Sequence, residues 1–201
     1  MKIAIEAQRI FRPNKHGMDF VALETIRELQ KIDHDNEYFI FVSPGLRCPS
    51  YPLWEQIALP RAVARIHPDL LHCTSNTAPV WCPVPLILTL HDIIFLEKRQ
   101  SSSRSLYQEM GWHYRRLVVP RILQRCKKII TVSNFECNRI REALELPQNL
   151  LKAVYNGYSP HFRPLSPAPE ITHKYIPADN YLFFLGNTDP KKNTPRVLRA
   201  Y

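Results

Sequence analysis

The sequence has 201 residues, 45% of them hydrophobic, and a formal net charge of +9. This composition excludes a disordered chain, and no run approaches the roughly 20 apolar residues of a membrane-spanning helix. A basic excess suits nucleic acid, an anionic membrane surface or phosphorylated small molecules, and equally an ordinary solvated surface. The N-terminal segment MKIAIEA begins a strand-like alternation without an apolar leader, so we expect a cytoplasmic protein.

Apolar residues alternate in some segments and recur at helical spacing in others, which divides the chain into strands and helices. Their succession predicts an α/β fold with a Rossmann-like, mostly parallel sheet flanked by helices. Pro120 is expected to kink or split the longest helix. In chain order, the predicted elements are a strand over 2–7, a helix over 18–32, strands over 37–43 and 69–73 with a short helix over 61–66 between them, a strand over 86–90, a helix over 104–126, a strand over 128–133, a helix over 135–146, strands over 150–155 and 181–185, and a helix from 194.

A polar loop over 8–17 joins the first predicted strand to the first predicted helix. It carries Arg9, Arg12 and His16 and ends at Gly17. The first amide groups of a helix are unpaired and lie at the positive end of its dipole, so such a loop can bind an anion. An ordinary strand-to-helix turn is the alternative, and the G-x-G-x-x-G fingerprint of dinucleotide-binding proteins is absent.

The run Pro85–Phe95 contains the most informative polar pair of the chain. Its apolar part, 86–90, has only Thr89 as a polar residue and is typical of a central parallel strand that is buried on both faces. His91 and Asp92 follow where that strand would end. Parallel sheets bind ligands beyond the carboxyl ends of their strands. These two side chains therefore either face a ligand or hold a loop together.

Ser133 and Asn134 lie between a predicted apolar strand and the helix that follows it. Their side-chain oxygens can accept a hydrogen bond from the first turn of a helix, so we expect them to cap it. As at the polar loop over 8–17, a strand gives way here to a helix N-terminus. With Arg9, Arg12 and His16 they form the candidate residues for contacting an acceptor or for holding loops.

Prolines accumulate over 159–177, which indicates a linker. We place a first lobe at 1–163, the linker at 164–180 and the first part of a second lobe at 181–201. The apolar run Tyr181–Leu185 is typical of a strand that needs sheet partners. Our hypothesis is that it pairs with another copy of the chain, which would give a homodimer, or adds to an existing sheet edge.

The cysteines are odd in number and include no Cys-x-x-Cys pair. Neither a disulfide framework nor a zinc site is indicated, so we expect free thiols in a reducing compartment. The five residues are Cys48, Cys73, Cys82, Cys126 and Cys137.

Several stretches resemble glycosyltransferase family 4, the retaining nucleotide-sugar glycosyltransferases with two facing Rossmann-like lobes. The opening IAIEAQRIFRPNKHGMDFV is similar to the family's first strand, glycine loop and helix, and TLHDIIFLE to its strand ending in His-Asp. ITVSNFECNRI is similar to its hydrophobic-Thr-Val-Ser strand and the helix after it. LLKAVYNGYSPHFRP and YLFFLGNTDPKKN are similar to the end of the first lobe and the beginning of the second. The stretches follow the family's order over nearly the whole chain.

The resemblance implies roles for residues of the first lobe. Gly17 takes the place of the glycine loop that approaches the donor phosphates. Many members have a second glycine two residues on, where this chain has Asp19, and a carboxylate there would repel a diphosphate. His91 takes the position near the transferred sugar, with Asp92 beside it, and these two are the expected catalytic residues.

The resemblance also implies a donor-phosphate site at the start of the second lobe. In the family, a basic turn after the first strand of that lobe holds the nucleotide diphosphate, and Gly186, Lys191 and Lys192 fit it. Cations there stabilise the charge that develops on the leaving group. The family's acidic E-x7-E segment is expected beyond Tyr201, so we expect a truncated fold that is inactive by itself.

The resemblance thus implies the N-terminal part of a retaining, hexosyltransferase-like enzyme of glycan biosynthesis. It would move a sugar from a nucleotide-sugar donor to a glycan or a lipid-linked acceptor, without a cofactor and without a metal ion. Peripheral contact with the inner face of a membrane is a further expectation, whereas nucleic acid is not an expected partner. The alternative is a non-catalytic basic α/β module that binds nucleic acid or an anionic lipid surface, although no RRM-type motif is present.

Overall fold

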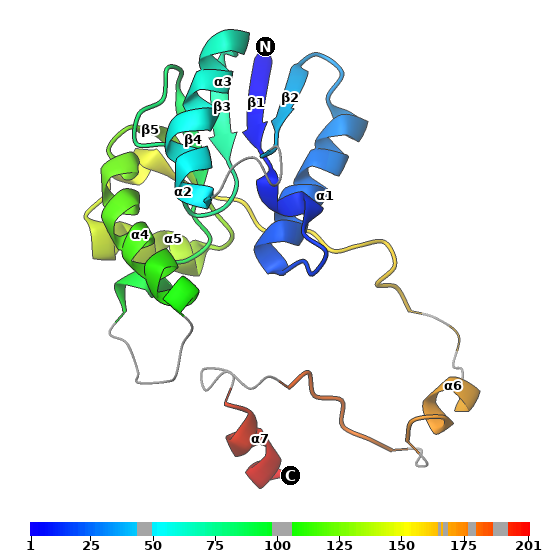
Figure 1. The fold of residues 1–201 in the computed structure, drawn as a ribbon. Coiled ribbons are helices and arrows are strands. Elements are labelled where there is room, and N and C mark those ends of the chain that lie inside the picture. The colour runs from blue at the N-terminus through cyan, green and yellow to red at the C-terminus, as the bar shows by residue number, and fades with distance from the viewer. Residues whose placement is uncertain (44–49, 98–105, 165, 167–168, 177–179, 187–192) are drawn as a thin grey trace. The chain divides into compact units, whose positions relative to one another are not determined.

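The structure is a computed structural model, and its chain divides into two compact units, Met1–Gly157 and Tyr158–Tyr201. Figure 1 shows both, and each unit is described by itself. The lobe boundary expected at residue 163 lies slightly beyond this division. The described residues are 1–43, 50–97, 106–164, 166, 169–176, 180–186 and 193–201.

The first unit is built on a six-stranded sheet in which all neighbouring strands are parallel. The strand order is β2-β1-β3-β4-β5-β6, so β4 lies in the interior of the sheet, as its continuous apolar run predicts. The predicted α/β, Rossmann-like fold is confirmed. The strands are β1 (Lys2–Glu6), β2 (Glu37–Phe41), β3 (Leu70–Cys73), β4 (Leu86–Thr89), β5 (Cys126–Thr131) and β6 (Leu151–Ala153).

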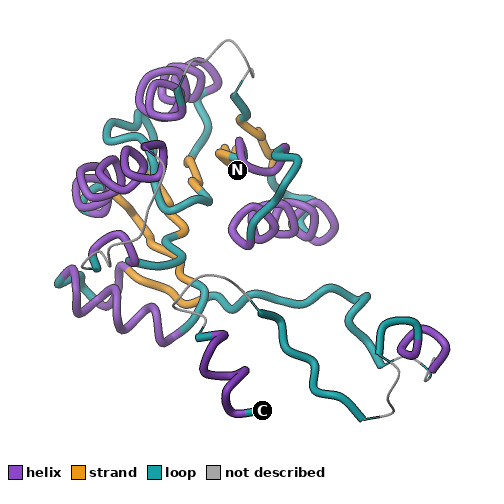
Figure 2. Tube along the Cα trace, turned by 60° about the horizontal axis from the view of Figure 1, so that its bottom comes forward, coloured by secondary structure: helices purple, strands orange, loops and turns teal. Residues whose placement is uncertain are grey.

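Helices connect most of these strands and cover both faces of the sheet. In Figures 1 and 2, α1 lies on one side of the sheet, and α3 and α4 lie on the other. Short 3-10 turns follow β1 and β4 and precede β6. The helices of this unit are α1 (Gly17–Ile32), α2 (Tyr51–Leu53), α3 (Leu59–Ile66), α4 (Leu106–Leu123) and α5 (Asn134–Leu144).

Successive side chains of a strand point to opposite faces, and along β1 they enter two different cores. Ile5 packs in a small core with Ile26 of α1. Ala4 belongs to the larger core, which includes Val63 of α3 and Val119 of α4. Burial of each large aliphatic side chain contributes about 1.5–3 kcal/mol to stability. The two cores fix the sheet between its helices, and so fix the ends of its strands.

Two helical segments differ from the sequence prediction. Over 51–66 the sequence predicts a helix only at 61–66, but the structure has α2, a π-helical turn at Trp54–Ala58 and then α3. The prolines of this stretch stand in the first turns of α2 and α3, where proline is tolerated. Helix α4 continues through Pro120 to Leu123, so that proline does not split it.

The described residues of the second unit contain α6 (Pro169–His173) and α7 (Thr194–Ala200). The first of these lies inside the predicted linker. Tyr181–Leu185 is not a strand, and the six-stranded sheet does not include it, so the predicted strand is wrong for the single chain. Its apolar side chains are exposed, with Phe183 at 83% and Leu185 at 84%. A strand requires hydrogen-bonding partners, and pairing with a second copy stays a prediction.

Candidate active site

The carboxyl ends of β1, β3 and β4 lie side by side, because these strands are neighbours in a parallel sheet. Buried polar residues gather there in an otherwise apolar fold. Glu6 ends β1, the segment Thr74–Thr77 follows β3, and His91 follows β4, and all of them are buried. This is the edge at which parallel sheets bind ligands, so it is the candidate active site.

His91 is held by the loop between β3 and β4. Its backbone N–H donates to Oδ1 of Asn76 at 2.6 Å, and its ring Nε2 lies 3.0 Å from the carbonyl oxygen of Thr74. Burial lowers the pKa of the His91 imidazole, against opposing effects of the Thr74 carbonyl and the neighbouring Asp92. This lowering favours the neutral form of the imidazole.

Asp92 is only half-buried and engages the loop after β4. Its Oδ1 accepts a hydrogen bond from the backbone N–H of Ile94 at 3.1 Å, at the start of a 3-10 turn. This is an Asx-type contact, which fits the loop-holding alternative for this residue. The sequence places His91 and Asp92 together, but the structure gives them different surroundings.

The loop before α1 contains a buried ion pair. Asp19 is fully buried, accepts a hydrogen bond from the His16 N–H at 2.9 Å, and lies with Oδ1 3.9 Å from Nη1 of Arg9. Its carboxylate therefore caps the helix and faces the Arg9 guanidinium. The Asp19 carboxylate is thus enclosed beside a cation rather than open to solvent, and the expectation that it repels a diphosphate stays a prediction.

The other loop residues differ in exposure. Gly17 and His16 are exposed and Arg12 is half-buried. A Cβ atom at Gly17 would meet no atom within 4 Å, so local packing within the chain does not require a glycine there. The Arg9 guanidinium also stands 5.9 Å from the ring centre of Tyr51. The structure thus brings Arg9 inward and leaves His16 and Gly17 at the surface.

Two buried carboxyl groups near this edge were missed by the sequence analysis. Glu55, in the π-helical turn, accepts hydrogen bonds from Thr77 Oγ1 at 2.5 Å, from Tyr51 Oη at 2.7 Å, from Gln56 Nε2 at 3.1 Å and from the Tyr114 hydroxyl. Burial raises the pKa of Glu55, and these four donors oppose that rise. Glu55 ties α2, α4 and the β3–β4 loop together.

Glu6 is the second buried carboxyl group. Its Oε1 accepts a hydrogen bond from the Gln8 N–H at 3.1 Å, whereas Oε2 is enclosed without a hydrogen-bond partner among the described residues. Burial raises the pKa of Glu6 to about 7, the Gln8 amide lowers it, and the nearby Glu55 carboxyl raises it. The sequence did contain a signal for this site, because Glu6 is an acidic residue at the carboxyl end of the strand Lys2–Glu6, directly after its apolar residues.

Ser133 and Asn134 begin α5. Ser133 Oγ accepts from the Glu136 N–H at 3.2 Å, which confirms the predicted N-cap for Ser133, whereas Asn134 is the first residue of the helix and not its cap. The Asn134 N–H donates to the Tyr155 hydroxyl at 3.2 Å. Neither residue hydrogen-bonds to His91 in the described part of the chain.

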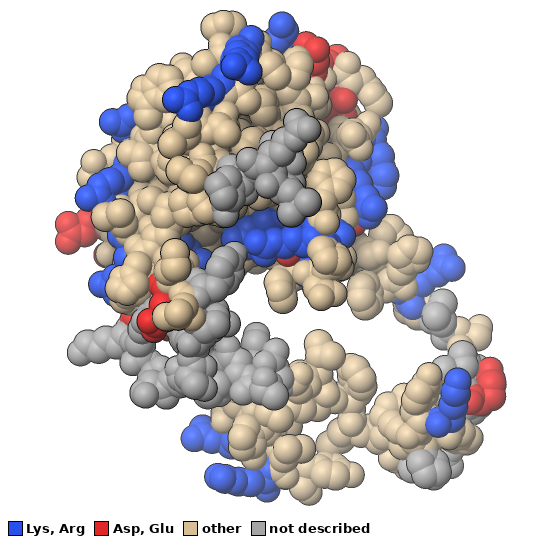
Figure 3. All heavy atoms as spheres, viewed as in Figure 1, with Lys and Arg blue, Asp and Glu red and all other residues tan. Residues whose placement is uncertain are grey.

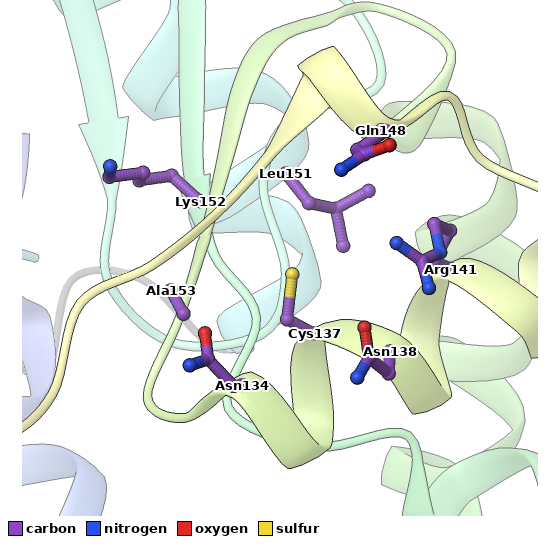
Figure 4. A pocket seen from close by; sticks show the side chains of 8 residues that line it. All are labelled: Asn134, Cys137, Asn138, Arg141, Gln148, Leu151, Lys152 and Ala153. Atoms are coloured by element: carbon purple, nitrogen blue, oxygen red, sulfur yellow. The ribbon is translucent and has the colours of Figure 1, made fainter.

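A shallow hollow of about 280 Å³ opens beside Asn134 (Figure 4). In the close-up Cys137 points from α5 toward Leu151, while Lys152 points away from them. The side chains from β1, β3 and β4 described above do not line this hollow. Its lining residues are Asn134, Cys137, Asn138, Arg141, Gln148, Leu151, Lys152 and Ala153.

Apart from Gly17, the expected donor-phosphate residues belong to the second unit. Lys191 and Lys192 lie outside the described residues. Gly186 is described and exposed, and a Cβ atom there would lie 3.4 Å from the ring of Phe184. The expected role of these three residues in holding the donor phosphates stays a prediction.

The surface of the first unit is basic on the face shown in Figure 3. Lys and Arg side chains are spread over this face and outnumber the acidic ones there.

Three further features of the described residues bear on the function. Within the described ranges, no group of three or more His, Cys, Asp or Glu residues is placed to hold a metal ion. None of the described helices combines the length and apolar character needed to cross a membrane. The described cysteines are free.

Comparison with known proteins identifies the family. A search of curated proteins found no match. The sequence profile of Glycosyltransferase Family 4 matches residues 11–162, which include the loop before α1, the Asn76–His91 contact and the start of α5. This match spans more than half of the chain and agrees with the parallel sheet and its polar carboxyl edge. The chain belongs to glycosyltransferase family 4.

Proposed function

We propose that this chain is the acceptor-binding lobe of a retaining glycosyltransferase that moves a sugar from a nucleotide-sugar donor to a glycan or a lipid-linked acceptor. The single observation that carries the proposal is the family match over residues 11–162. His91 supports it, because a buried imidazole lies at the carboxyl end of a central strand, where such a sheet binds its ligand.

In this proposal His91 acts at the reacting sugar and Asp92 keeps the following turn in place. The Asp92 hydrogen bond to Ile94 supports that division of roles. Gly17 and the start of α1 approach the donor phosphates, since the helix N-terminus favours negative charge. Lys191 and Lys192 stabilise the leaving diphosphate electrostatically.

The acceptor is proposed to lie against the first unit, near the exposed His16 and the half-buried Arg12. Arg9 is partnered with Asp19, so it holds the loop rather than the acceptor. The described residues of the second unit include no strand. We therefore propose that residues 1–201 bind an acceptor without turnover, and that catalysis belongs to the product of the complete reading frame.

The test is release of nucleoside diphosphate from a panel of sugar nucleotides by the product of the complete reading frame. The matched variant is His91→Ala, and an exposed histidine, His34→Ala, is the control. We expect the His91 variant to lose about 100-fold or more in kcat, as for removal of a group that acts in the transition state. Full turnover in that variant would remove His91 from the mechanism, and no turnover with any donor would refute the proposed function.

A further inference from the structure

The tautomer of His91 follows from its hydrogen bonds. A carbonyl oxygen can only accept, so the 3.0 Å contact between Nε2 and the Thr74 oxygen requires a proton on Nε2. A neutral imidazole carries one proton, which leaves Nδ1 as an unprotonated acceptor. Nδ1 makes no hydrogen bond in the described part of the chain and is not among its enclosed, unpartnered atoms. Nδ1 is therefore not completely enclosed by the described residues.

The loop that fixes the ring is itself anchored on both sides. Thr74 Oγ1 donates to the backbone oxygen of Glu6 at 3.1 Å, which ties the loop to β1. The Asn76 N–H donates to the Thr89 oxygen at 3.1 Å, which ties it to β4. Thr77 is bound to Glu55. The neighbouring strands β1, β3 and β4, together with the π-helical turn, thus determine where the Thr74 carbonyl points.

Asn76 adds a local constraint. Its φ is 63°, in the left-handed region that asparagine tolerates better than most residues. This conformation places Oδ1 on the backbone N–H of His91 while the Asn76 N–H meets β4. The residue is buried, so both contacts are shielded from water and gain strength.

We propose that Thr74 and Asn76 are positioning residues that lock the His91 ring with its proton on Nε2 and present Nδ1 as a hydrogen-bond acceptor at the carboxyl edge of the sheet. Such a nitrogen meets a hydroxyl group of a substrate, because a phosphate oxygen offers it no proton. The identity of that substrate rests on the proposed function, whereas the tautomer and its support do not.

The test is the nitrogen-15 spectrum of the histidine rings in residues 1–201, with the His91 signals assigned by comparison with His91→Gln. We expect a single pattern in which Nε2 carries the proton and Nδ1 does not. Thr74→Val removes the hydroxyl at nearly constant shape and is expected to give a mixture of both tautomers. Thr74→Ser restores the hydroxyl and the single pattern. An Nδ1-protonated ring in the unmodified chain, or no difference between the Val and Ser variants, would overturn the proposal.

A second variant guards against misfolding of the first. Asn76→Gly retains the left-handed backbone at low cost but removes the side-chain amide, including the Oδ1 acceptor. It is expected to lower the melting temperature, because the buried His91 N–H loses its acceptor, while unfolding stays cooperative and the His91 ring also loses the single pattern. In the complete protein, Thr74→Val should lower kcat about ten-fold or more with a smaller change in KM, and Thr74→Ser should rescue it. A single tautomer without any glycosyl transfer would support this inference and refute only the proposed function.

Discussion

Glu6 and Glu55 are both fully buried at the same edge of the sheet, but their surroundings differ. Glu55 accepts hydrogen bonds from four side chains that belong to α2, the π-helical turn, the β3–β4 loop and α4. Glu6 accepts one from a backbone amide and leaves Oε2 without a hydrogen-bond partner among the described residues. Burial raises the pKa of both carboxyl groups, so the comparison teaches that the supply of hydrogen-bond donors, rather than burial, separates a carboxyl group that holds several elements together from one that does not.

The largest effect is expected from Glu55→Ala. The change leaves several buried donors without an acceptor and opens a cavity, so it should lower the free energy of unfolding by about 3 kcal/mol or more. Urea unfolding at pH 7 measures it. The exposed Glu24→Ala, which removes only a surface pair with Arg27, is the control and should cost less than about 0.5 kcal/mol. Equal losses of unfolding free energy in the two variants would show that Glu55 does not hold α2, α4 and the β3–β4 loop together.

A smaller effect, dependent on pH, is expected from Glu6→Gln. The folded state holds the Glu6 proton up to a pKa of about 7, whereas the unfolded chain releases it near 4.5. Folding therefore binds a proton in this window, and the stability that the carboxyl group contributes is greatest below pH 4.5 and is lost as the pH rises through 7. The glutamine stays neutral, so the variant should gain about 3 kcal/mol relative to the unmodified chain across this window.

Unfolding free energies measured from pH 4.5 to pH 8 give that difference. The difference between the two proteins is the quantity to use, because His72 has the opposite slope. Burial lowers the pKa of His72 to about 4, so its contribution is lost as the pH falls through that value. A difference that does not change with pH would mean that Glu6 is already ionised in the folded chain.

The smallest effect on stability is expected from Phe183→Asp. Phe183 lies outside the surroundings of both Glu6 and Glu55, so this variant shows how little an exposed substitution changes the stability. Its ring is 83% exposed, so the free energy of unfolding of the first unit should change by less than about 0.5 kcal/mol. If Tyr181–Leu185 pairs between copies, the same change should convert a dimer into a monomer in analytical ultracentrifugation. Phe162→Asp, at an equally exposed ring, is the control. A monomeric unmodified chain at all concentrations would refute the pairing.

Much of the fold could be predicted, because the apolar patterns are local. The alternation in β1 and the continuous run of β4 indicate a buried parallel sheet, and the position after β4 indicates His91 as a site residue. The helical segment Tyr51–Ile66 was largely missed because its prolines also suit loops. The prediction of a strand at Tyr181–Leu185 was wrong for the single chain, because an apolar pattern does not show whether a neighbouring strand is present to form hydrogen bonds with it.

The sequence by itself determined the α/β class, the positions of the six sheet strands along the chain, and the polar residue after β4, since each depends on spacing within one segment. Only the tertiary structure decided which carboxyl groups are enclosed, that Asp19 faces Arg9, and that Thr74 and Asn76 hold His91. These contacts join residues far apart in the chain or around a loop. A side chain's charge and tautomer depend on the donors and acceptors that folding brings to it.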